Sequence, residues 1–520
     1  MTIRVACIGG GPGGLFFTAL LRKLMPEAEV VLVERNQSSD AFGFGVVFSD
    51  ATLRRIHEAD PVLMDGLRDY GTHWETIEVW LKGEKISFGG NGMTAIHRKA
   101  LLSLLQSRAR EFGVQMRFGE NTTSLDSLDG FDLIVAADGA NSLVREKLGV
   151  KHLGHEVETA TAKFIWFGTT FIFDGLTFIH RRSEHGNFAA HAYPISSELS
   201  TFIVETNEVT WRRAGLDVFD SDGPPGPSDE KSQHYLEALF AGDIGGEPLV
   251  ANNSRWANFR TRRTVGTWHS SNVVLLGDAA HTAHFSVGSG TKMAMEDAVV
   301  LAREVAKTPS NLGSAIARYE AERMPQVAKI HDAARPSLSW WEHFGRNHEA
   351  LEPLQFAFHF ASRSIGIGKI RQRDPDLVKA VEDDWRSRHG ASPRDSPLVA
   401  VSGETFKCRR LRVLADGEAL VGVTDGVTEL RLDGAGVVAA IAPDNETDMD
   451  EAINLLPATP STVLLSGGNA FTRALLAEEA RLAKGHTVIL LGTADDDEFA
   501  TLLLSGRVDA VASPNAAHNA

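Results

Sequence analysis

The sequence predicts an α/β protein in which a nucleotide-binding domain of parallel strands is joined by an inserted antiparallel sheet, a helical segment and a small C-terminal α/β domain. Three observations support this class. A glycine-rich turn links a strand pattern to a helix pattern near the N-terminus, strand patterns dominate residues 155–263, and short strands alternate with helical stretches after residue 398. At 520 residues the chain has room for two or three domains.

The first element is a strand, turn, helix and strand unit. The run Ile3–Ile8 leads into Gly9-x-Gly11-x-x-Gly14, a helical pattern follows, and the strand pattern at 30–33 ends at Glu34. Gly9 permits the tight turn, Gly11 lets a pyrophosphate approach the backbone, and Gly14 lets helix and strand pack closely. The alternative, a glycine turn without a ligand, explains less of this context. We therefore predict a Rossmann-type dinucleotide site that includes Gly9, Gly11, Pro12, Gly13, Gly14, Glu34 and Arg35.

Two later motifs return to the same kind of ligand. Each places an aspartate at the end of a buried strand pattern, first in Asp138-Gly139 and then in Gly277-Asp278. Asp278 can hold a ribitol or ribose hydroxyl. The glycine-rich loop after it opens a helix predicted over 291–307, and a helix N-terminus favours negative charge, such as that on the pyrimidine edge of a reduced flavin. The loop residues predicted to bind are Gly288, Gly290, Thr291 and Lys292.

Composition excludes several classes of protein. The net charge of −16 argues against a nucleic-acid binder, and no apolar run reaches membrane-spanning length. The two cysteines, Cys7 and Cys408, lie far apart and indicate a reducing environment. The N-terminus resembles no secretory signal. We expect a cytoplasmic protein without nucleic-acid or membrane partners and without a metal site.

The pattern along the chain predicts a main body over residues 1–390, a linker at 391–397 and a C-terminal domain at 398–520. The body contains a substrate sheet at about 72–97 and 155–265 and a helical part at about 315–390. In the C-terminal domain we expect consecutive βα units forming a parallel sheet. Its strand candidates are Val437–Ile441, Val463–Leu465, Val488–Leu491 and Val508–Val511.

With these motifs in this order, residues 1–390 resemble the FAD-dependent aromatic hydroxylases of the para-hydroxybenzoate hydroxylase family. The resemblance implies that the glycine motif binds the ADP half of FAD, that Asp138-Gly139 serves FAD and the passing nicotinamide cofactor, and that Asp278 binds the ribityl chain. It also assigns Arg98 to the FAD phosphates, with a surface helix charge as the alternative, and Val46 and Val47 to the flavin mouth through their backbones. Phe285 and Lys292 replace a proline and an asparagine usual in the family, which points to a subgroup.

Within the family, the sequence looks most like the salicylyl-CoA 5-hydroxylases and nearly as much like the 2-aminobenzoyl-CoA monooxygenases. The similarity rests on four segments, Gly43–Ser49, Phe164–Thr170, His191–Pro194 and Gly277–Asp297. It implies that NADH or NADPH reduces FAD, that O2 forms a C4a-hydroperoxyflavin, and that an aryl-CoA, foremost salicylyl-CoA, becomes the 5-hydroxy (gentisyl-CoA) product. The alternatives are 2-aminobenzoyl-CoA, another aromatic such as an indole, and an FAD-dependent reductase without oxygen chemistry. A homodimer is also conceivable.

Residues for the substrate are open at this stage. His281, His284 and His191 are candidates for contact with the phenol, and each could equally be a structural histidine. Tyr193 and Glu205 are weaker candidates for the same role. The CoA phosphates need cations, and three pairs could supply them or simply be solvated surface charges. These pairs are Arg181-Arg182, Arg212-Arg213 and Arg262-Arg263.

The end of the chain faintly resembles the end of an old-yellow-enzyme barrel, especially Leu504–Asp509. Four strand candidates are too few for a barrel that needs eight βα units. Ala512-Ser513-Pro514 also replaces the glycine-arginine pair expected after the last strand. We therefore expect a barrel remnant, one FAD and no FMN.

Overall fold

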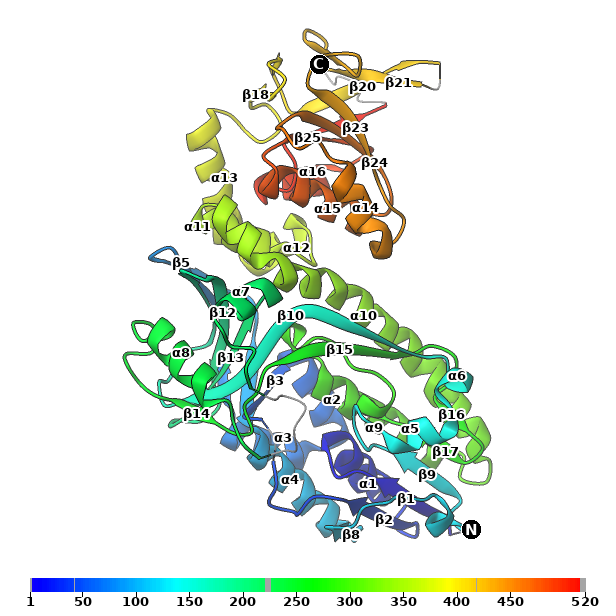
Figure 1. Ribbon diagram of the computed structural model, residues 1–520. Helices are drawn as coiled ribbons and strands as arrows, with labels where there is room; N and C mark the ends of the chain where they lie inside the picture. The colour runs from blue at the N-terminus through cyan, green and yellow to red at the C-terminus, as the bar shows by residue number, and fades with distance from the viewer. Residues whose placement is uncertain (1, 42, 220–225, 418, 515–520) are drawn as a thin grey trace. The chain divides into compact units, whose positions relative to one another are not determined.

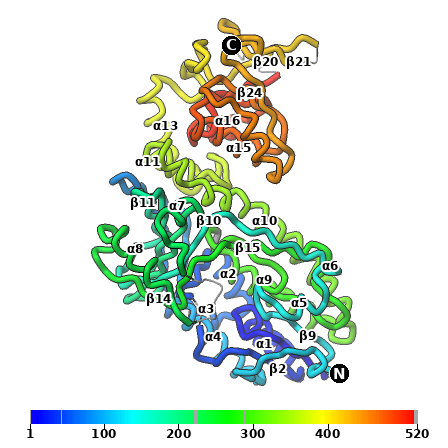
Figure 2. The backbone as a smooth tube through the Cα atoms, in the orientation of Figure 1, coloured from blue at the N-terminus to red at the C-terminus, as the bar shows by residue number. Residues whose placement is uncertain are grey.

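The computed structural model describes residues 2–41, 43–219, 226–417 and 419–514 (Figures 1 and 2). The last six residues of the predicted C-terminal domain lie outside this part. Residue contacts divide the chain into two compact units, which are described separately here. The first unit comprises Met1–Trp80 and Asn91–Glu342, and the second comprises Leu81–Gly90 and His343–Ala520. Within the described residues, no helix has both the length and the apolar character required to span a bilayer.

The first unit contains a six-stranded sheet that is parallel except for one short edge strand. β1 (Arg4–Ile8) lies at its centre and is buried at every position after Arg4. The helix α1 (Pro12–Leu24) follows the glycine turn and packs against α9 (Gly290–Lys307), as Figure 1 shows. The predicted glycine turn and the predicted helix at 291–307 are therefore confirmed. The other strands are β16 (His269–Ser270), β17 (Val273–Leu275), β9 (Leu133–Ala136), β2 (Glu29–Glu34) and β8 (Gln115–Phe118).

The second sheet of this unit is largely antiparallel, as predicted. Two parts of the chain supply it, and its strands lie in the order β14, β10, β13, β12, β11, β5, with β15 also paired to β10. Only the β11–β5 pair is parallel. Within the predicted sheet segment 72–97, Glu75-Thr76 lie outside the strands. The bounds are β5 (Ile77–Leu81), β10 (His155–Thr169), β11 (Leu176–Ser183), β12 (Gly186–Pro194), β13 (Ser200–Thr206), β14 (Leu249–Ala251) and β15 (Ala257–Thr264).

The two faces of this large sheet differ. Alternate side chains of β10–β13, among them Phe167, Phe188 and Phe202, form an apolar core with α8 (Glu230–Phe240). Because side chains alternate along a strand, the intervening residues point to the opposite face. That face carries aromatic and ionisable side chains and is described below.

The rest of the first unit positions these two sheets. A three-stranded sheet pairs β3 (Gly45–Ser49) and β4 (Thr72–Trp74) with β7 (Met93–His97). Helices flank all three sheets, and α10 runs on into the second unit. They are α2 (Asp50–Ala59), α3 (Pro61–Tyr70), α4 (Arg98–Glu111), α5 (Leu143–Leu148), α6 (Val150–Leu153), α7 (Glu208–Arg213) and α10 (Leu312–Ala350), with 3-10 turns η1 (Asp126–Leu128), η2 (Gly277–Ala279) and η3 (Phe285–Val287).

The second unit is built on a seven-stranded sheet in the order β22, β21, β20, β26, β25, β24, β23. The four predicted strands are its parallel part, β23 (Val437–Ala442), β24 (Thr462–Gly467), β25 (Thr487–Leu491) and β26 (Ala510–Ser513). Sequence reasoning missed three strands that extend it; the first pairs parallel with β26, and the other two continue the sheet by antiparallel pairing. They are β20 (Arg410–Asp416), β21 (Ala419–Thr424) and β22 (Glu429–Arg431); a short hairpin pairs β18 (Leu398–Val399) with β19 (Thr405–Phe406).

The helices of the second unit come from two stretches of sequence. Those between the strands are α14 (Met449–Leu455), α15 (Ala470–Glu478) and α16 (Asp496–Leu504), with short turns η4 (Glu446–Asp448) and η5 (Glu479–Ala483). Those before the sheet are α11 (Pro353–Ala361), α12 (Ile367–Arg373) and α13 (Pro375–His389), and the strand β6 (Glu84–Phe88) belongs to this unit too. Residues 343–389, placed in the body by sequence, thus share contacts with the C-terminal sheet.

An ion network ties these helices to the sheet domain. The buried Glu478 of α15 pairs with Arg346 at 2.7 Å and with Arg507 at 2.8 Å, and His359 of α11 lies 3.2 Å away. Burial lowers the pKa of His359 to about 4, with Arg507 acting in the same direction and Glu478 acting to raise it. The network makes residues 343–389 and the sheet one structural unit.

Candidate active site

The glycine turn packs as tightly as the motif suggests. Gly9 has φ +108°, and a Cβ there would lie 2.2 Å from the carbonyl oxygen of Ala137. A Cβ on Gly14 would lie 2.1 Å from the carbonyl oxygen of Gly9, and one on Gly13 would lie 2.6 Å from Leu276. A Cβ on Gly11, in contrast, would meet nothing within 4 Å. Gly9, Gly13 and Gly14 therefore have no room for a side chain, while Gly11 borders open space.

Glu34 and Arg35 follow β2 at the same edge of the sheet. The carboxylate of Glu34 accepts from the Gly10 N–H at 2.6 Å and from the backbone N–H of Asn36 at 2.8 Å. Arg35 is exposed, and Pro12 begins α1. Glu34, predicted as part of the dinucleotide site, thus holds the glycine turn from the end of β2.

The two aspartate motifs follow β9, which pairs with β1, and β17, which pairs with β9. Because β1, β9 and β17 are parallel, Gly9, Asp138 and Asp278 lie along one edge of the sheet. One oxygen of Asp138 accepts from Val144 N–H at 3.2 Å, and its other oxygen is buried without a hydrogen-bond partner among the described residues. A Cβ on the next residue, Gly139, would meet nothing within 4 Å.

Arg98 lies near both Asp278 and Tyr193, which belong to other elements. Asp278 is solvent-accessible, yet desolvation raises the pKa of its carboxyl despite the positive charges of His281 and Arg98. Burial lowers the pKa of Arg98, with Asp278 and Tyr193 acting in the opposite direction. Burial raises the pKa of Tyr193 to about 12, and its hydroxyl donates to Gly45 O at 3.5 Å. Arg98, predicted to contact the FAD phosphates, thus lies near both Asp278 and the predicted substrate residue Tyr193.

The glycine loop before α9 also borders open space. Gly288 has φ +58°, and a Cβ on either Gly288 or Gly290 would meet nothing within 4 Å. Between them, the buried Ser289 Oγ has no hydrogen-bond partner in the described chain. Thr291 and Lys292, in the first turn of α9, are half-buried, and Val46 and Val47 lie on β3 opposite Ile96 and Ala95.

These features fit an extended polar cofactor such as FAD. At four of these glycines a Cβ would meet open space. Buried polar atoms on Arg98, Asp138 and Ser289 lack hydrogen-bond partners among the described residues. Buried polar groups are normally hydrogen-bonded, so a ligand is the natural partner for these three.

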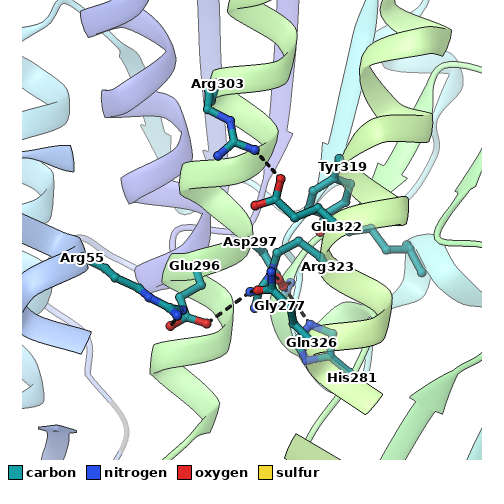
Figure 3. A network of polar contacts seen from close by, with 11 residues as sticks. Arg55, Gly277, His281, Glu296, Asp297, Arg303, Tyr319, Glu322, Arg323 and Gln326 are labelled. Atoms are coloured by element: carbon teal, nitrogen blue, oxygen red, sulfur yellow. Dashed lines mark hydrogen bonds and ion pairs between the residues drawn. The ribbon is translucent and has the colours of Figure 1, made fainter. Parts of the chain in front are cut away.

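His281 belongs to a buried ion network between α9 and α10, drawn in Figure 3. Its Nε2 contacts Asp297 at 2.8 Å, and Asp297 also accepts from Arg323 Nε at 2.7 Å and from Gly277 N–H at 3.1 Å. Arg323 continues to Glu296, which pairs with Arg55 at 2.6 Å. Desolvation of Asp297 is outweighed by the two cations, so its pKa is lowered. Among the three predicted histidines, His281 is the one held by this network.

The other two histidines meet at a different carboxylate. Glu205 Oε1 lies 2.6 Å from His191 Nε2, and Glu205 Oε2 lies 3.6 Å from His284 Nε2. All three side chains are buried. Glu205 was a weaker candidate from sequence. The available signal was its position in β13, where it shares a face with Ile203, opposite to the apolar core residues Phe202 and Val204.

Most of the predicted arginines have acidic or polar partners. Arg181 makes two hydrogen bonds to Asp243, Arg212 pairs with Glu208 at 2.6 Å, and Arg263 lies 3.4 Å from Glu158. Arg262 donates to Asn141 Oδ1 at 3.0 Å and lies close enough to Asp278 to influence its pKa. Arg182 and Arg213 are exposed. The structure therefore places Arg262 at the predicted cofactor edge, whereas Arg181, Arg212 and Arg263 each pair with a different acidic residue.

One exposed group has metal-ligand chemistry, although none was predicted. Asp50, His73 and Glu75 bring potential ligand atoms within 4.8 Å of one another. His73 is already engaged, since its ring nitrogens lie 3.1 Å from Thr94 Oγ1 and 3.1 Å from Glu75 Oε1. We assign this group no metal role.

Comparisons with known proteins agree with this arrangement. The model of the FAD binding domain family matches residues 131–334. A salicyloyl-CoA 5-hydroxylase of Streptomyces sp. is 52% identical over 519 residues, covering 98% of this chain and 99% of the relative. Protodeoxyviolaceinate monooxygenase of Chromobacterium violaceum is 30% identical over 346 residues, covering 65% of this chain and 89% of its own.

Solved structures show the same fold for the larger part of the chain. The tetrameric form of 2-methyl-3-hydroxypyridine-5-carboxylic acid oxygenase matches with a TM-score of 0.52 at 19% identity, covering 70% of this chain and 98% of its own. PqsL of P. aeruginosa, in complex with 2-aminobenzoylacetate, matches with a TM-score of 0.51 at 22% identity, covering 66% and 97%. The sequence relationship over nearly the full length shows that the chain belongs to the FAD-dependent aromatic hydroxylases of the para-hydroxybenzoate hydroxylase family and is a monooxygenase that uses FAD, NAD(P)H and O2.

Proposed function

We propose that this enzyme hydroxylates an aryl-CoA thioester, and specifically salicyloyl-CoA at ring carbon 5. The observation that carries the proposal is the 52% identity to a salicyloyl-CoA 5-hydroxylase over 98% of this chain. That match extends through the second unit, whereas the two solved structures match 66% and 70% of the chain. The similarity is therefore to the whole chain rather than to a shared flavin-binding body alone.

Ring chemistry accounts for the position of attack. The thioester withdraws electrons from the ring, while the ortho hydroxyl activates the carbon para to itself, which is carbon 5. Bound FAD supplies the activated oxygen of such a reaction. The protein must hold the ring, exclude water and manage the hydroxyl proton. The aromatic face of the large sheet, described below, suits all three tasks.

For FAD we propose the residues that surround the sheet edge. The pyrophosphate would approach the backbone at Gly11, and the guanidinium of Arg98 would pair with the phosphates. Asp278 would hold the ribityl hydroxyls, Asp138 would use its unpaired oxygen, and Lys292 with the loop before it would face the flavin ring. The support for this assignment is the open space at the glycines and the unpartnered buried atoms on these elements.

For the CoA phosphates we propose exposed arginines rather than the whole predicted set. Arg181 is half-buried and neutralised by Asp243, so it is a poor partner for a phosphate. Arg182, Arg212 and Arg213 are exposed and remain the candidates. Charge reversal of any one that binds should raise the KM for the thioester without changing FAD content.

The test compares substrates on the purified holoenzyme. NADH or NADPH oxidation, O2 consumption and product identity are measured with salicyloyl-CoA, 2-aminobenzoyl-CoA, benzoyl-CoA and free salicylate. We expect salicyloyl-CoA to stimulate NAD(P)H oxidation and to yield its 5-hydroxy thioester with matching O2 use. Equal hydroxylation of free salicylate would contradict the CoA requirement. Preferred turnover of 2-aminobenzoyl-CoA would replace the proposed substrate, and NAD(P)H oxidation without any hydroxylated product would contradict oxygen insertion.

A further inference from the structure

One face of the large sheet is lined by aromatic and ionisable residues. Strand register places Phe178 opposite His191 and His191 opposite Ile203, while Phe164 lies opposite Glu205. Paired residues point to the same face, so these side chains share a surface that is distinct from the apolar core on the other side. The face is therefore one site built from four strands.

Aromatic rings cover this face. Trp341 of α10 lies with its ring centre 4.0 Å from that of His191 and stacks on His180 at an angle of 5°. Phe285 of η3 approaches His191 at 5.5 Å and Phe164 at 5.0 Å. Flat apolar walls of this kind suit a planar aromatic ring and exclude water.

Glu205 is a carboxylate within this aromatic enclosure, with an exposed fraction of 1%. It is placed diagonally to His191 across the β12–β13 pair, since His191 opposes Ile203, and this accounts for the 2.6 Å separation of Oε1 and Nε2. The two atoms lie at ion-pair distance without hydrogen-bond alignment, and catalytic hydrogen bonds often become aligned only when substrate binds. A buried carboxylate is costly unless neighbouring groups balance its charge. Two histidines on different elements, His191 and His284, lie within 3.6 Å of it.

The contacts continue from Glu205 into the loop before α9. His284 Nε2 lies 3.6 Å from Glu205 Oε2, and His284 Nδ1 lies 2.7 Å from Ser286 Oγ. Ser286 Oγ in turn lies 3.0 Å from Ser337 Oγ on α10. Since His284 Nδ1 also accepts from Ser286 N–H at 3.4 Å, its Nε2 carries the proton that faces Glu205. Glu205 thus links the sheet to the loop before α9.

We propose that Glu205 is the acceptor of the substrate's ring-hydroxyl proton, reached through His191, and that His284 positions Glu205 for this role. The proposal rests on the proposed function, because it requires a phenolic substrate. It singles out Glu205, the weaker candidate from sequence, rather than His281, whose Nε2 is engaged with Asp297.

The transfer balances without any further reagent. The O–H bond of the phenol breaks and its electron pair stays on the ring oxygen. The proton enters the His191 imidazole, and the Nε2 proton of that ring passes to Glu205 Oε1. One phenol becomes a phenolate and one carboxylate becomes a carboxylic acid, while His191 ends neutral. The phenolate is the more electron-rich ring and the better target for an electrophilic oxygen.

The electrostatics of Glu205 suit this role. Burial raises its pKa to about 7, His284 acts to lower it, and Glu342 of α10 acts to raise it. Glu342 is fixed by accepting from Thr161 N–H at 2.6 Å. The titratable groups facing Glu205 are therefore His191 on β12, His284 before η3 and Glu342 on α10. A carboxylate near neutrality can take up and release a proton at working pH.

The test measures ionisation of the bound phenol in the oxidised holoenzyme without NAD(P)H. Salicyloyl-CoA is titrated from pH 5.5 to 9.5, and the phenolate absorbance of the bound ligand is followed by difference spectra. In the wild type we expect the bound phenol to ionise at lower pH than the free ligand. In Glu205→Gln we expect the apparent pKa of the bound phenol to rise by at least about one unit, which makes the phenol a tenfold weaker acid. Glu230→Gln, on the exposed side of α8, is the matched control and should match the wild type.

The outcomes separate this role from a structural one. A change in Kd with no change in the ionisation of the bound phenol would overturn the proposal, as would ionisation of the phenol in Glu205→Gln at the wild-type pH. If Glu205→Gln fails to hold FAD, His191→Gln replaces it, with the same shift expected. Absence of ligand binding in the wild type contradicts the proposed substrate instead. The ligand-free holoenzyme then tests Glu205 itself, since its raised pKa makes wild-type stability fall as pH rises from about 4.5 to 7, and Glu205→Gln should remove that fall.

Discussion

Replacement of Asp297 by asparagine should destabilise the first unit strongly. Asp297 is 0% exposed and contacts His281 at 2.8 Å and Arg323 at 2.7 Å, and Arg323 is itself 1% exposed. The substitution keeps the size of the side chain and removes its charge. It therefore leaves two buried cationic partners without the carboxylate that balances them (Figure 3).

The size of the stability loss depends on the contacts that remain after Asp297→Asn. Breaking a buried ion pair by removing one partner costs about 3–5 kcal/mol. Arg323 keeps Glu296 at 3.2 Å, and the amide oxygen can still accept one hydrogen bond, for example from Gly277 N–H. We therefore expect a loss at the lower end, about 3 kcal/mol in the free energy of unfolding.

Urea unfolding of the holoenzyme at pH 7 measures this loss, with tryptophan fluorescence and FAD release followed together. Glu322→Gln is the control, because Glu322 and its partner Arg303 are both 38% exposed. Exposed pairs contribute about 0–1 kcal/mol. If Asp297→Asn costs no more than Glu322→Gln, the assignment of a stabilising role to this network is refuted.

Three further predictions follow from particular residues. Gly14→Val should prevent folding, because its Cβ would lie 2.1 Å from Gly9 O, whereas Gly11→Val should fold yet lose FAD, since its Cβ meets open space; circular dichroism and flavin content distinguish the two. Glu304 is desolvated, but hydrogen bonds from three cations lower its pKa to about 2, so the stability it contributes is complete above pH 4.5 and is lost as pH falls towards 2. Between these pH values the stability of Glu304→Gln should fall less steeply than that of the wild type, and an unchanged slope would count against this reasoning. Truncation after Pro393 removes Glu478 and leaves Arg346 unbalanced, so soluble yield should fall more than FAD per chain, and the full chain should hold FAD without FMN; FMN in the flavin extract would contradict the last expectation.

The local elements of the fold were largely readable from sequence. The β1–turn–α1–β2 unit follows from a period-2 pattern, three glycines and a period-3.6 pattern within a short stretch. The four parallel strands of the second unit follow from repeated apolar runs at even spacing. β20–β22 escaped this reasoning because they carry charged residues and are partly exposed, so their alternation is weak.

The candidate site was readable in part. The glycines and both aspartates could be chosen because backbone freedom and strand ends leave a mark on neighbouring residues. The three histidines looked alike, and the structure separates them, since His281 contacts Asp297 while His191 and His284 meet at Glu205. The arginine pairs were also alike until Arg181 was seen beside Asp243.

The sequence by itself determined the class of protein, the nucleotide turn and the approximate positions of the parallel strands along the chain, because each depends on residues within about one supersecondary unit. Only the tertiary structure decided which charges neutralise one another and which residues share a face of the large sheet. Phe285 and Trp341 reach His191 from distant segments, and Glu205 is buried between strands and loop. Charge balance and burial act through space over a few ångströms, so they depend on contacts between segments that are far apart along the chain.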